Sequence, residues 1–445
     1  TGASYPVRAG NLVRHLIDGD PAFRRIRGAV EDARHSVWLT VAFFAHDFRF
    51  PGEGDGLFDA LDRAVERGVD VRILFWRPGA ESAGYGRTFS GTPEDRDWLA
   101  GRGSRIRIRW DRAEGAFCHH QKSWLIDAGR PTETAFVGGI NLTARALGAP
   151  GHRHGGQHDL SVELRGPSAT DVHHNFVQRW NGASERASPS GIWPPEVRAA
   201  DLAFPARASA PRGTSEVQIG RMIAPRLYAD GTATPGGRPF DIAGGERSIL
   251  EQYRNAIDAA RSSIYIENQA LPIPEIAGRL EAAARRGVDI VLLVPAEPED
   301  HVRSARRDPA KSALFAGIEA LARCGNVLLA GLAAGGGEEH RSVYVHAKAM
   351  LVDDAWATVG SCNLHRNSLS GHTEMNASVW DRDVVRALRR DLFLEHLHED
   401  TGDLDDRAAL RRFREVARAN ADRERSGDRT RQGLAFALDA EDYAR

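Results

Sequence analysis

The sequence VYVHAKAMLVD occupies residues 343–353 and is followed by GSCN at residues 360–363. A second copy of this arrangement lies earlier in the chain, as HQKSWLID at residues 120–127 and GGIN at residues 138–141. Each copy contains the pattern His-x-Lys-x-x-x-x-Asp and then a glycine-containing turn that ends in Asn. Two copies with the same order and similar spacing predict that the chain is an internal duplication.

The two motifs are expected to present a histidine and a lysine on one face of a strand. Val, Leu and Ile residues surround both motifs and favour extended structure. Side chains two residues apart share a face of a strand, so His120 points the same way as Lys122. By the same rule His346 points the same way as Lys348. Each copy then offers a nucleophile or base beside a positive charge.

The turns after the motifs complete a predicted phosphate pocket. Small residues in these turns allow close approach of the backbone, and they are Gly138, Gly139, Gly360 and Ser361. Asn141 and Asn363 follow them, and we expect each Asn to begin a helix. The N-terminus of a helix attracts anions. The combination of imidazole, ammonium, amide and helix end therefore predicts that the pocket binds phosphate.

The duplicated motif resembles that of the phospholipase D superfamily. Two further stretches are similar to phospholipases D proper, which are the nearest likeness within it. IYIENQ, at residues 264–269, lies near the start of the second half, and LRGP, at 164–167, leads to NFVQRWN, at 175–181, near the end of the first. The resemblance covers most of residues 25–400. It implies an enzyme that cleaves a phosphodiester through a covalent phosphohistidine.

The resemblance also implies a role for each motif residue. His120 is the expected nucleophile and His346 the expected general acid and base, although the symmetry of the motifs does not choose between them. Because a phosphodiester is anionic and resists hydroxide, side chains must donate to its oxygens, and the candidates are Lys122, Lys348, Asn141 and Asn363. The two imidazoles need opposite protonation, which predicts a bell-shaped pH profile.

Four carboxylates are expected to support the site. An imidazole presents the correct nitrogen only when its other nitrogen is held. Asp159 and Glu374 each open a strand after the Asn turn, and we expect them to hold the two histidines. Asp127 and Asp353 end the motif strands on the opposite face, where we expect them to fix a turn.

The alternation of apolar strands with amphipathic helices predicts an α/β fold. We expect two duplicated α/β sandwich halves, each a mostly parallel buried sheet flanked by helices. The halves should pack with pseudo-two-fold symmetry around one shared active site. The first half covers residues 1–181, a connector covers 182–215, the second half covers 216–400, and a charged helical tail covers 401–445.

Composition indicates a globular protein that folds without stabilising disulfides or structural metal ions. The 445 residues are 42% hydrophobic and 27% charged, and the net charge of -2 disfavours nucleic acid as a partner. The sequence contains no run of about twenty apolar residues, so no transmembrane segment is predicted. The three cysteines match neither a disulfide framework nor a zinc pattern, and they are Cys118, Cys324 and Cys362. Nothing in the sequence chooses between secretion and the cytoplasm.

No metal and no other cofactor are expected. Several histidines gather in one region of the sequence, at positions His152, His154, His158, His173 and His174. A zinc site built on them would also need partners at ligand spacing. No set of carboxylates accompanies them along the chain.

The expected substrate is a phospholipid in a membrane surface or micelle. Cleavage of its head-group phosphodiester by a monomeric protein would release phosphatidic acid and an alcohol such as choline, with water or another alcohol as acceptor. Apolar candidates for the mouth of the site are Phe43, Phe44, Phe48, Phe50, Leu328, Leu329 and Leu332. The alternatives are a nuclease or other non-lipid phosphodiesterase, a cardiolipin-synthase-like phosphatidyltransferase, and a non-catalytic phosphate- or lipid-binding protein.

Overall fold

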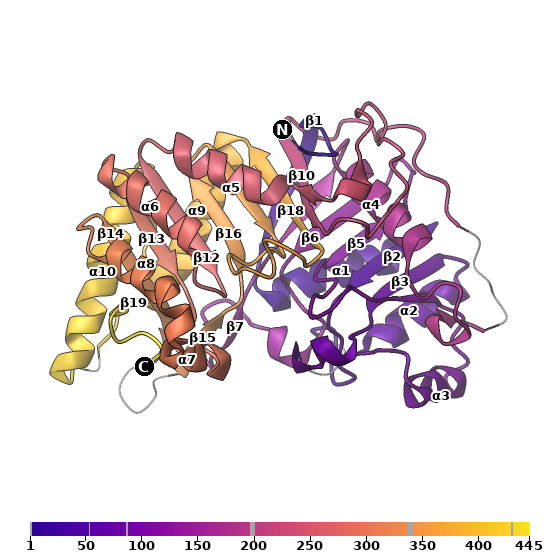
Figure 1. Cartoon of the computed structure of the whole chain (residues 1–445), viewed down its shortest axis with the longest axis horizontal. Coiled ribbons are helices and arrows are strands. Elements are labelled where there is room, and N and C mark those ends of the chain that lie inside the picture. Colours follow the sequence, from indigo (N-terminus) through magenta and orange to yellow (C-terminus); the bar gives the residue numbers. More distant parts are fainter. Residues whose placement is uncertain (1, 53, 86–87, 196–200, 336–340, 429) are drawn as a thin grey trace.

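The computed structural model describes all residues except 1, 53, 86–87, 196–200, 336–340 and 429. Two halves of similar architecture lie side by side along the long axis of the molecule (Figure 1). The first half carries the indigo to magenta elements, and the second half carries the orange to yellow elements. The α/β class and the duplicated halves predicted from the sequence are confirmed.

The first half is built on a mixed sheet. Strand β2 pairs in parallel with β3, which pairs in parallel with β4, while β5, β6, β8 and β1 follow on the other side of β2 in antiparallel order. The short strand β9 covers the far edge at β4. The bounds are β1 Arg8–Ile17, β2 Ser36–Val41, β3 Asp70–Trp76, β4 Arg107–Asp111, β5 Ser123–Ile126, β6 Thr134–Gly138, β7 Gly156–His158, β8 Leu160–Arg165 and β9 Ile192–Trp193.

The second half repeats this order strand by strand. Strand β12 pairs in parallel with β13, which pairs in parallel with β14, while β16, β17, β18 and β10 follow in antiparallel order. The bounds are β10 Ser215–Ile223, β11 Glu246–Arg247, β12 Ser263–Asn268, β13 Asp289–Leu293, β14 Val327–Ala334, β15 Arg341–Val345, β16 Lys348–Val352, β17 Trp356–Gly360, β18 Glu374–Trp380 and β19 Ala435–Ala437.

Helices cover both faces of the two sheets. In α1, apolar residues recur at helical spacing, as Phe23, Ile26 and Val30, and this stripe is buried against the sheet. The bounds are α1 Gly19–Asp32, α2 Leu57–Glu66, α3 Pro93–Gly101, α4 Ala169–Gly182, α5 Ser248–Ala259, α6 Pro274–Arg285, α7 Asp300–Arg307, α8 Ser312–Ala322, α9 Arg382–Leu397 and α10 Asp406–Ser426.

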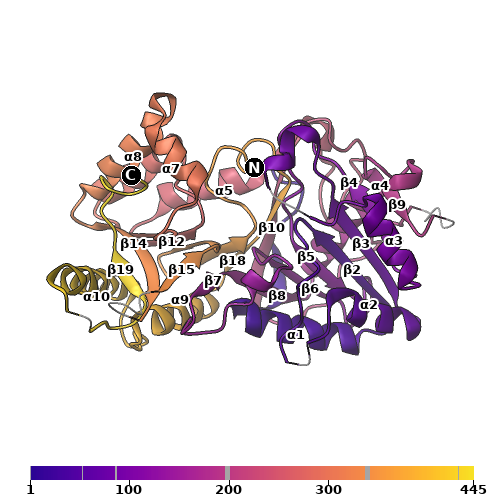
Figure 2. The same cartoon turned by 90° about the horizontal axis from the view of Figure 1, so that it is seen from below.

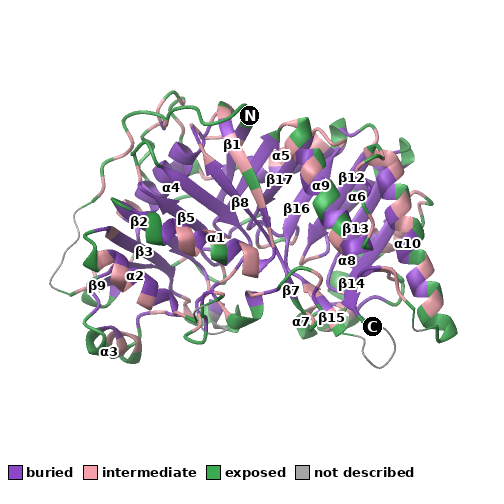
Figure 3. Ribbon diagram, turned by 180° about the vertical axis from the view of Figure 1, so that it is seen from behind, coloured by how far each residue is buried: buried purple, intermediate pink, exposed green. Residues whose placement is uncertain are grey.

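The interior has one shared core and two outer cores. The shared core joins α4 of the first half to α9 and α10 of the second half through the sheet faces between them. The outer cores lie under α1 and α2 in one half and under α5, α6 and α8 in the other. Most strands accordingly show as buried in Figure 3, with β1 as an exception, whereas exposed residues follow the outer faces of the helices. Burial on both faces explains why the strand sequences are almost continuously apolar.

Among the residues that the structure describes, three backbone pairings join the two halves. Strand β1 pairs antiparallel with β10, which links the two sheets edge to edge. Strand β7 leaves the first half and pairs in parallel with β15 of the second half, as Figure 2 shows near its centre. His119 forms a matching parallel bridge to Thr373. The last two pairings bring the motif histidines to the boundary between the halves.

The C-terminal residues pack on the second half. Helix α10 buries Leu410 and Phe413 against α9 and against the sheet at β12 and β13. Strand β19, which the sequence did not predict, pairs antiparallel with β14. Across the part of the chain that the structure describes, none of the helices combines the length and the apolar composition needed to span a bilayer.

Candidate active site

The motif histidines lie just before the motif strands rather than inside them. Strand β5 begins at Ser123, after His120 and Lys122, and strand β16 begins at Lys348, after His346. The reason is that these histidine backbones pair with the opposite half. The N–H of His120 donates to the carbonyl of Thr373, with an N···O distance of 2.9 Å. The N–H of His346 donates to the carbonyl of His158, at 2.8 Å.

The carboxylates expected to hold the histidines contact them, and each contact crosses between the halves. Nδ1 of His120 lies 2.9 Å from Oε2 of Glu374, and Nδ1 of His346 lies 2.6 Å from Oδ2 of Asp159. Both carboxylates are fully buried. A ring nitrogen held in this way leaves Nε2 of each imidazole as the atom that can react with substrate.

Hydrogen bonds fix Glu374 from several directions. Ser361 Oγ donates to Oε2 of Glu374 at 2.6 Å, and Ser368 Oγ donates to Oε1 at 2.5 Å. The carbonyl of Ser361 also lies 3.1 Å from Nδ1 of His120. Ser361 therefore binds both members of the His120–Glu374 pair. Ser368 was not identified from the sequence.

Both motif lysines are buried beside the histidines. Lys122 Nζ donates to the carbonyl of His120 at 2.7 Å, and Lys348 Nζ donates to the carbonyl of His346 and to Oε1 of Gln269, the latter at 3.1 Å. Burial lowers the pKa of Lys122 to about 8. Burial, together with the charge of Lys122, lowers the pKa of Lys348 to about 7, against the opposing effect of Asp159.

The charges of the two halves act on one another at this site. Burial is the main cause that lowers the pKa of His120 well below its usual value, and the charges of Lys122, Lys348 and His346 lower it further. Burial and Lys348 lower the pKa of His346 to about 4. Both imidazoles are therefore neutral at pH 7 before substrate binds. The sequence predicted one neutral and one protonated imidazole. For this to hold, one of the two histidines must take up a proton when an anion binds.

The two asparagines lie at equivalent places, but neither begins a helix. Asn141 is followed by a short 3-10 turn at Ala144–Ala146, and Asn363 is followed by turns, so the predicted helix ends are wrong. Asn363 Nδ2 lies 3.4 Å from Oε1 of Gln269. In both asparagines Oδ1 is buried without a hydrogen-bond partner among the described residues. A buried amide with a free polar atom is suited to a polar ligand.

The glycines of the turns allow the carboxylates to approach. A Cβ atom on Gly139 would lie 2.4 Å from Oδ1 of Asp159 and 3.2 Å from Cδ of Lys348. A Cβ atom on Gly138 would lie 2.0 Å from Oγ of Ser161, and one on Gly360 would lie 2.2 Å from Oδ1 of Asn376. Side chains at these positions would push the strands of the carboxylates away from the motifs.

The last residues of the two motifs make equivalent contacts away from the histidines. Asp127 Oδ1 accepts hydrogen bonds from the backbone N–H groups of Arg34 and His35, at 3.0 and 2.7 Å. Asp353 accepts from the backbone N–H groups of Ser262 and Ser263, at 2.8 and 2.9 Å. Asp127 thus binds the chain where β2 begins, and Asp353 binds it where β12 begins. Both residues have positive φ, 54° and 55°.

Only one of the apolar candidates for the mouth of the site lies there. Phe43 is half-buried, its ring centre is 6.1 Å from that of His120, and Lys122 Nζ lies 5.8 Å from it. The others are buried in the hydrophobic cores, so a place at the mouth is wrong for Phe44, Phe48, Phe50, Leu328, Leu329 and Leu332. The three phenylalanines lie in the segment after β2, which folds back onto the core, and the three leucines lie within β14.

Two residues that the sequence did not single out complete the surroundings. Gln269 follows β12, and its side chain contacts Lys348, Asn363 and the hydroxyl of Tyr344, the last at 2.9 Å. The ring of His372 lies 5.9 Å from that of His120. The IYIENQ stretch ends at Gln269, which is the signal that could have identified it.

Comparison with known proteins identifies the family of this arrangement. A family described as "Cardiolipin synthase, PLD-like domain" matches residues 26–180 and 253–395, which contain both motifs. Cardiolipin synthase 1 of Staphylococcus aureus (strain MRSA252) is 24% identical over 385 residues, and cardiolipin synthase A of Pseudomonas putida (strain W619) is 26% identical over 383 residues. Each alignment covers 85% of this chain.

The chain spans 66% of the length of the S. aureus protein and 67% of the P. putida protein. Among solved structures, phosphatidylserine synthase of Haemophilus influenzae Rd KW20 matches with a TM-score of 0.56 and 12% identity, over 96% of this chain and 97% of the other, and shares the fold. The curated relatives named here are cardiolipin synthases, so the expected likeness to phospholipases D proper holds only at the level of the superfamily. This chain belongs to the PLD-like domain family of the phospholipase D superfamily.

Proposed function

We propose that this protein transfers a phosphatidyl group from one phospholipid to the hydroxyl of an acceptor alcohol, as the names of its relatives indicate for cardiolipin synthesis. The observation that carries the proposal is the pair of crossed contacts, Glu374 with His120 and Asp159 with His346. Two imidazoles that are each oriented by a buried carboxylate suit a nucleophile and an acid–base partner. The donor we propose is phosphatidylglycerol, and the acceptor is the head group of a second molecule of it.

In the first step, Nε2 of His120 attacks phosphorus while the bond from phosphorus to the head-group oxygen breaks. His346, protonated when the anionic lipid binds, gives its proton to the departing glycerol. The product is a phosphatidyl group joined to His120 through a P–N bond. Because burial keeps His120 neutral, its Nε2 lone pair is available for this attack at pH 7.

In the second step, the acceptor hydroxyl loses its proton to His346 and attacks phosphorus. The P–N bond breaks and His120 is restored. With phosphatidylglycerol as acceptor, the two phosphatidyl groups end on one glycerol, which is cardiolipin. Water at the same position would yield phosphatidic acid, so phospholipase D-type hydrolysis uses the same residues and competes with transfer.

Phosphorus gains negative charge on its oxygens in both steps. Lys122 and Lys348 are the cations nearest to the two imidazoles along the chain, and Asn141 and Asn363 supply amide groups from the same turns. In a buried site, fixed donors of this kind stabilise charge more strongly than water does. We assign these four side chains to the phosphate oxygens.

The test uses vesicles of phosphatidylglycerol and distinguishes transfer, hydrolysis and nuclease activity by their products. Cardiolipin and free glycerol, in equal amounts, are expected from transfer. If phosphatidic acid is the main product, the protein is a hydrolase and the proposed transfer is wrong. A parallel reaction with phosphatidylcholine and ethanol should give phosphatidylethanol, and cleavage of single-stranded DNA without any lipid product would favour the nuclease alternative.

Two variants accompany this assay. His120→Ala should lower the rate by a factor on the order of 10⁶, as loss of a covalent nucleophile does in other enzymes. His154→Ala changes an exposed histidine and should leave the rate within about twofold. A folded His120→Ala protein that keeps most of its activity would contradict the assignment of the nucleophile.

A further inference from the structure

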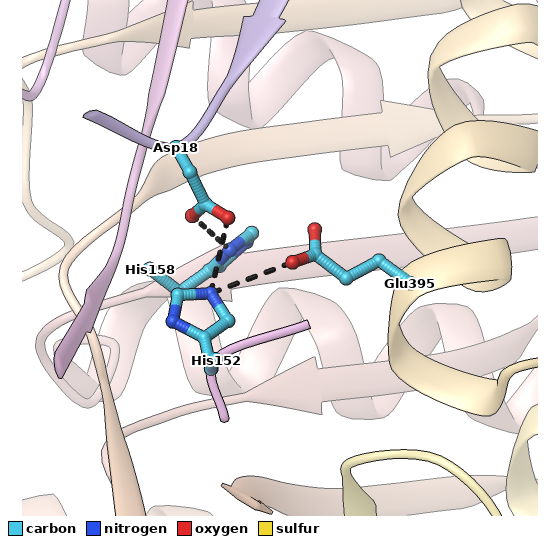
Figure 4. Close-up of side chains that lie close together, drawn as sticks. All are labelled: Asp18, His152, His158 and Glu395. Atoms are coloured by element: carbon cyan, nitrogen blue, oxygen red, sulfur yellow. Dashed lines mark hydrogen bonds and ion pairs between the residues drawn. The ribbon is translucent and has the colours of Figure 1, made fainter. Parts of the chain in front are cut away.

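Four buried side chains from distant parts of the sequence converge between the halves. Asp18 follows β1, His152 and His158 come from the loop around β7, and Glu395 comes from α9 of the second half (Figure 4). Each residue offers one ligand atom, and the four atoms lie within 4.8 Å of one another. Two carboxylates therefore lie beside these histidines in space, although they are distant from them along the chain.

Several polar atoms in this cluster have no hydrogen-bond partner. Both ring nitrogens of His152 and Oδ2 of Asp18 are buried and form no hydrogen bond among the described residues, although Nε2 of His152 lies 3.1 Å from Oδ2 of Asp18. The side chains of Asp18, His152 and His158 are fully buried, and that of Glu395 is 8% exposed. Burying polar atoms without partners costs free energy, and a cation bound to Nε2 of His152 and Oδ2 of Asp18 would offset this cost at these two atoms by accepting their lone pairs.

No lysine or arginine neutralises the carboxylates within the described part of the chain. Asp18 forms ion pairs only with His152 and His158 there, and Glu395 only with His152. Two carboxylates buried together repel one another unless a cation lies between them. The charge of the cluster therefore favours a positively charged ligand.

Two distances from His152 are close to the edge length of a metal coordination tetrahedron. Nε2 of His152 lies 3.1 Å from Oδ2 of Asp18 and 3.5 Å from Oε1 of Glu395. Zn²⁺ bonds to nitrogen and oxygen are about 2.0–2.1 Å long, so two ligands of a tetrahedral ion are separated by about 3.3 Å. We propose that Asp18, His152, His158 and Glu395 bind one Zn²⁺ ion at a structural site between the halves.

The surroundings of His158 supply the outer contact that a zinc-bound histidine usually makes. Nδ1 of His158 faces Asp18, and its Nε2 lies 3.0 Å from Oε2 of Glu267. The other oxygen of Glu267 contacts Nε2 of His396 at 2.9 Å and accepts from the hydroxyl of Tyr265 at 2.7 Å. A ligand histidine that binds a carboxylate through its second nitrogen has its ring orientation and tautomer fixed.

The proposed ion would hold the residue that orients His346. The N–H of Asp18 donates to the carbonyl of Asp159 at 2.8 Å, and the carbonyl of His158 accepts from the N–H of His346 at 2.8 Å. Asp18 and His158 thus combine a side chain in the cluster with a backbone contact at the proposed active site. Glu395 adds α9 of the second half to the same ion. The metal is structural, because its ligands are buried behind the imidazoles.

The site is tested on the full chain after removal of any affinity tag. The protein is stripped with a chelator, dialysed, reloaded with Zn²⁺ and passed through gel filtration before metal analysis. We expect about one zinc per chain and a melting temperature that rises on reloading. Substitution with Co²⁺ should give the visible absorption of a tetrahedral ion without thiolate charge transfer, which excludes binding by the cysteines.

A matched pair of variants locates the ion. His152→Gln removes a proposed ligand and should lose the bound zinc and the rise in melting temperature. His154→Gln changes an exposed histidine two residues away and should keep both. Retention of zinc by folded His152→Gln would overturn the proposal. If His152→Gln does not fold, the wild-type chain decides: failure to retain zinc, or an unchanged melting temperature after reloading, also overturns it.

Discussion

Nδ1 of His346 lies 2.6 Å from Oδ2 of Asp159, and these residues belong to opposite halves of the chain. The same relationship holds in reverse for His120 and Glu374. Neither half therefore contains both a motif histidine and the carboxylate that contacts its Nδ1. The boundary between the halves is where the proposed chemistry is assembled.

The first prediction concerns these carboxylates. Glu374→Gln and Asp159→Asn keep the shape of each side chain but remove the charge that stabilises a protonated imidazole and selects its tautomer. We expect each change to lower kcat by about 10²–10⁴-fold, the range seen when orienting carboxylates are replaced. The measurement is the initial rate of lipid product formation, with the amount of phosphatidyl group bound to the protein determined after rapid denaturation without acid, which would cleave the P–N bond.

Asp47→Asn is the control for this prediction, because Asp47 is exposed. It should be as active as the wild type. Ser368→Ala removes one hydrogen bond to Glu374 and should have an effect smaller than that of Glu374→Gln. Wild-type activity in both folded carboxylate variants would show that the contacts do not serve catalysis.

The second prediction concerns protons. Burial lowers the pKa of His346 to about 4, of Lys348 to about 7 and of Lys122 to about 8, so part of this positive charge is missing at pH 7. A bound anion favours the protonated forms and raises these pKa values. Binding of an anion should therefore take up protons near pH 7, and the part of the uptake that is due to the two lysines should fall as the pH is lowered below 7.

Calorimetric titration with sulfate, which carries no proton at pH 7, measures this uptake. The heat of binding should change with the ionisation enthalpy of the buffer, with a slope that corresponds to roughly one proton taken up. Lys348→Met removes the group whose pKa lies nearest to pH 7 and should reduce the slope. A binding heat that is the same in all buffers would contradict the prediction.

The third prediction separates stability from chemistry. Asp127 accepts backbone hydrogen bonds from the start of β2, and we expect Asp127→Ala to lower the free energy of unfolding by about 2 kcal/mol or more. Asp127→Asn keeps an acceptor oxygen and tolerates positive φ, so its loss should be smaller. Denaturant unfolding measures both values. Activity per folded molecule should remain near that of the wild type. A large fall in this activity would show that Asp127 takes part in the chemistry.

The fourth prediction concerns Phe43 and rests on the proposed transfer reaction. Its ring lies beside His120 and Lys122 and occupies space that water would otherwise fill. Phe43→Ala should raise the ratio of phosphatidic acid to transfer product severalfold, because water gains access to the phosphohistidine. Phe48→Leu, in the core, serves as the comparison and should leave the ratio unchanged. An unchanged ratio in Phe43→Ala would show that Phe43 does not influence the choice between water and alcohol as acceptor.

Local pattern was enough to predict the α/β halves and the motif residues, because strand and helix periodicities repeat in both copies. The pattern also indicated Asp159 and Glu374 as partners of the histidines. It could not indicate that the contacts cross, since spacing along a chain does not tell which strand edges meet. The sequence predicted that a helix begins at Asn363, yet contacts such as that of Ser368 with Glu374 hold this segment in turns.

Contacts between distant segments explain the other differences. Asp18 and Glu395 lie far from His152 in sequence, so no motif could place them in one cluster. Phe44 and Phe48 follow a strand end, where a surface position is reasonable, but Phe48 packs on Phe23 of α1, with ring centres 4.8 Å apart. Strand β19 is three residues long, which is too short for periodicity to reveal.

The pairing of β7 with β15 bears on how such a chain could have arisen. Each motif imidazole is oriented by a carboxylate of the other half. An ancestral protein consisting of a single half could therefore have worked only as a dimer of two identical chains. Fusion of the two genes would then have freed each copy to diverge, so that His120 and His346 could come to differ in surroundings while still relying on one another.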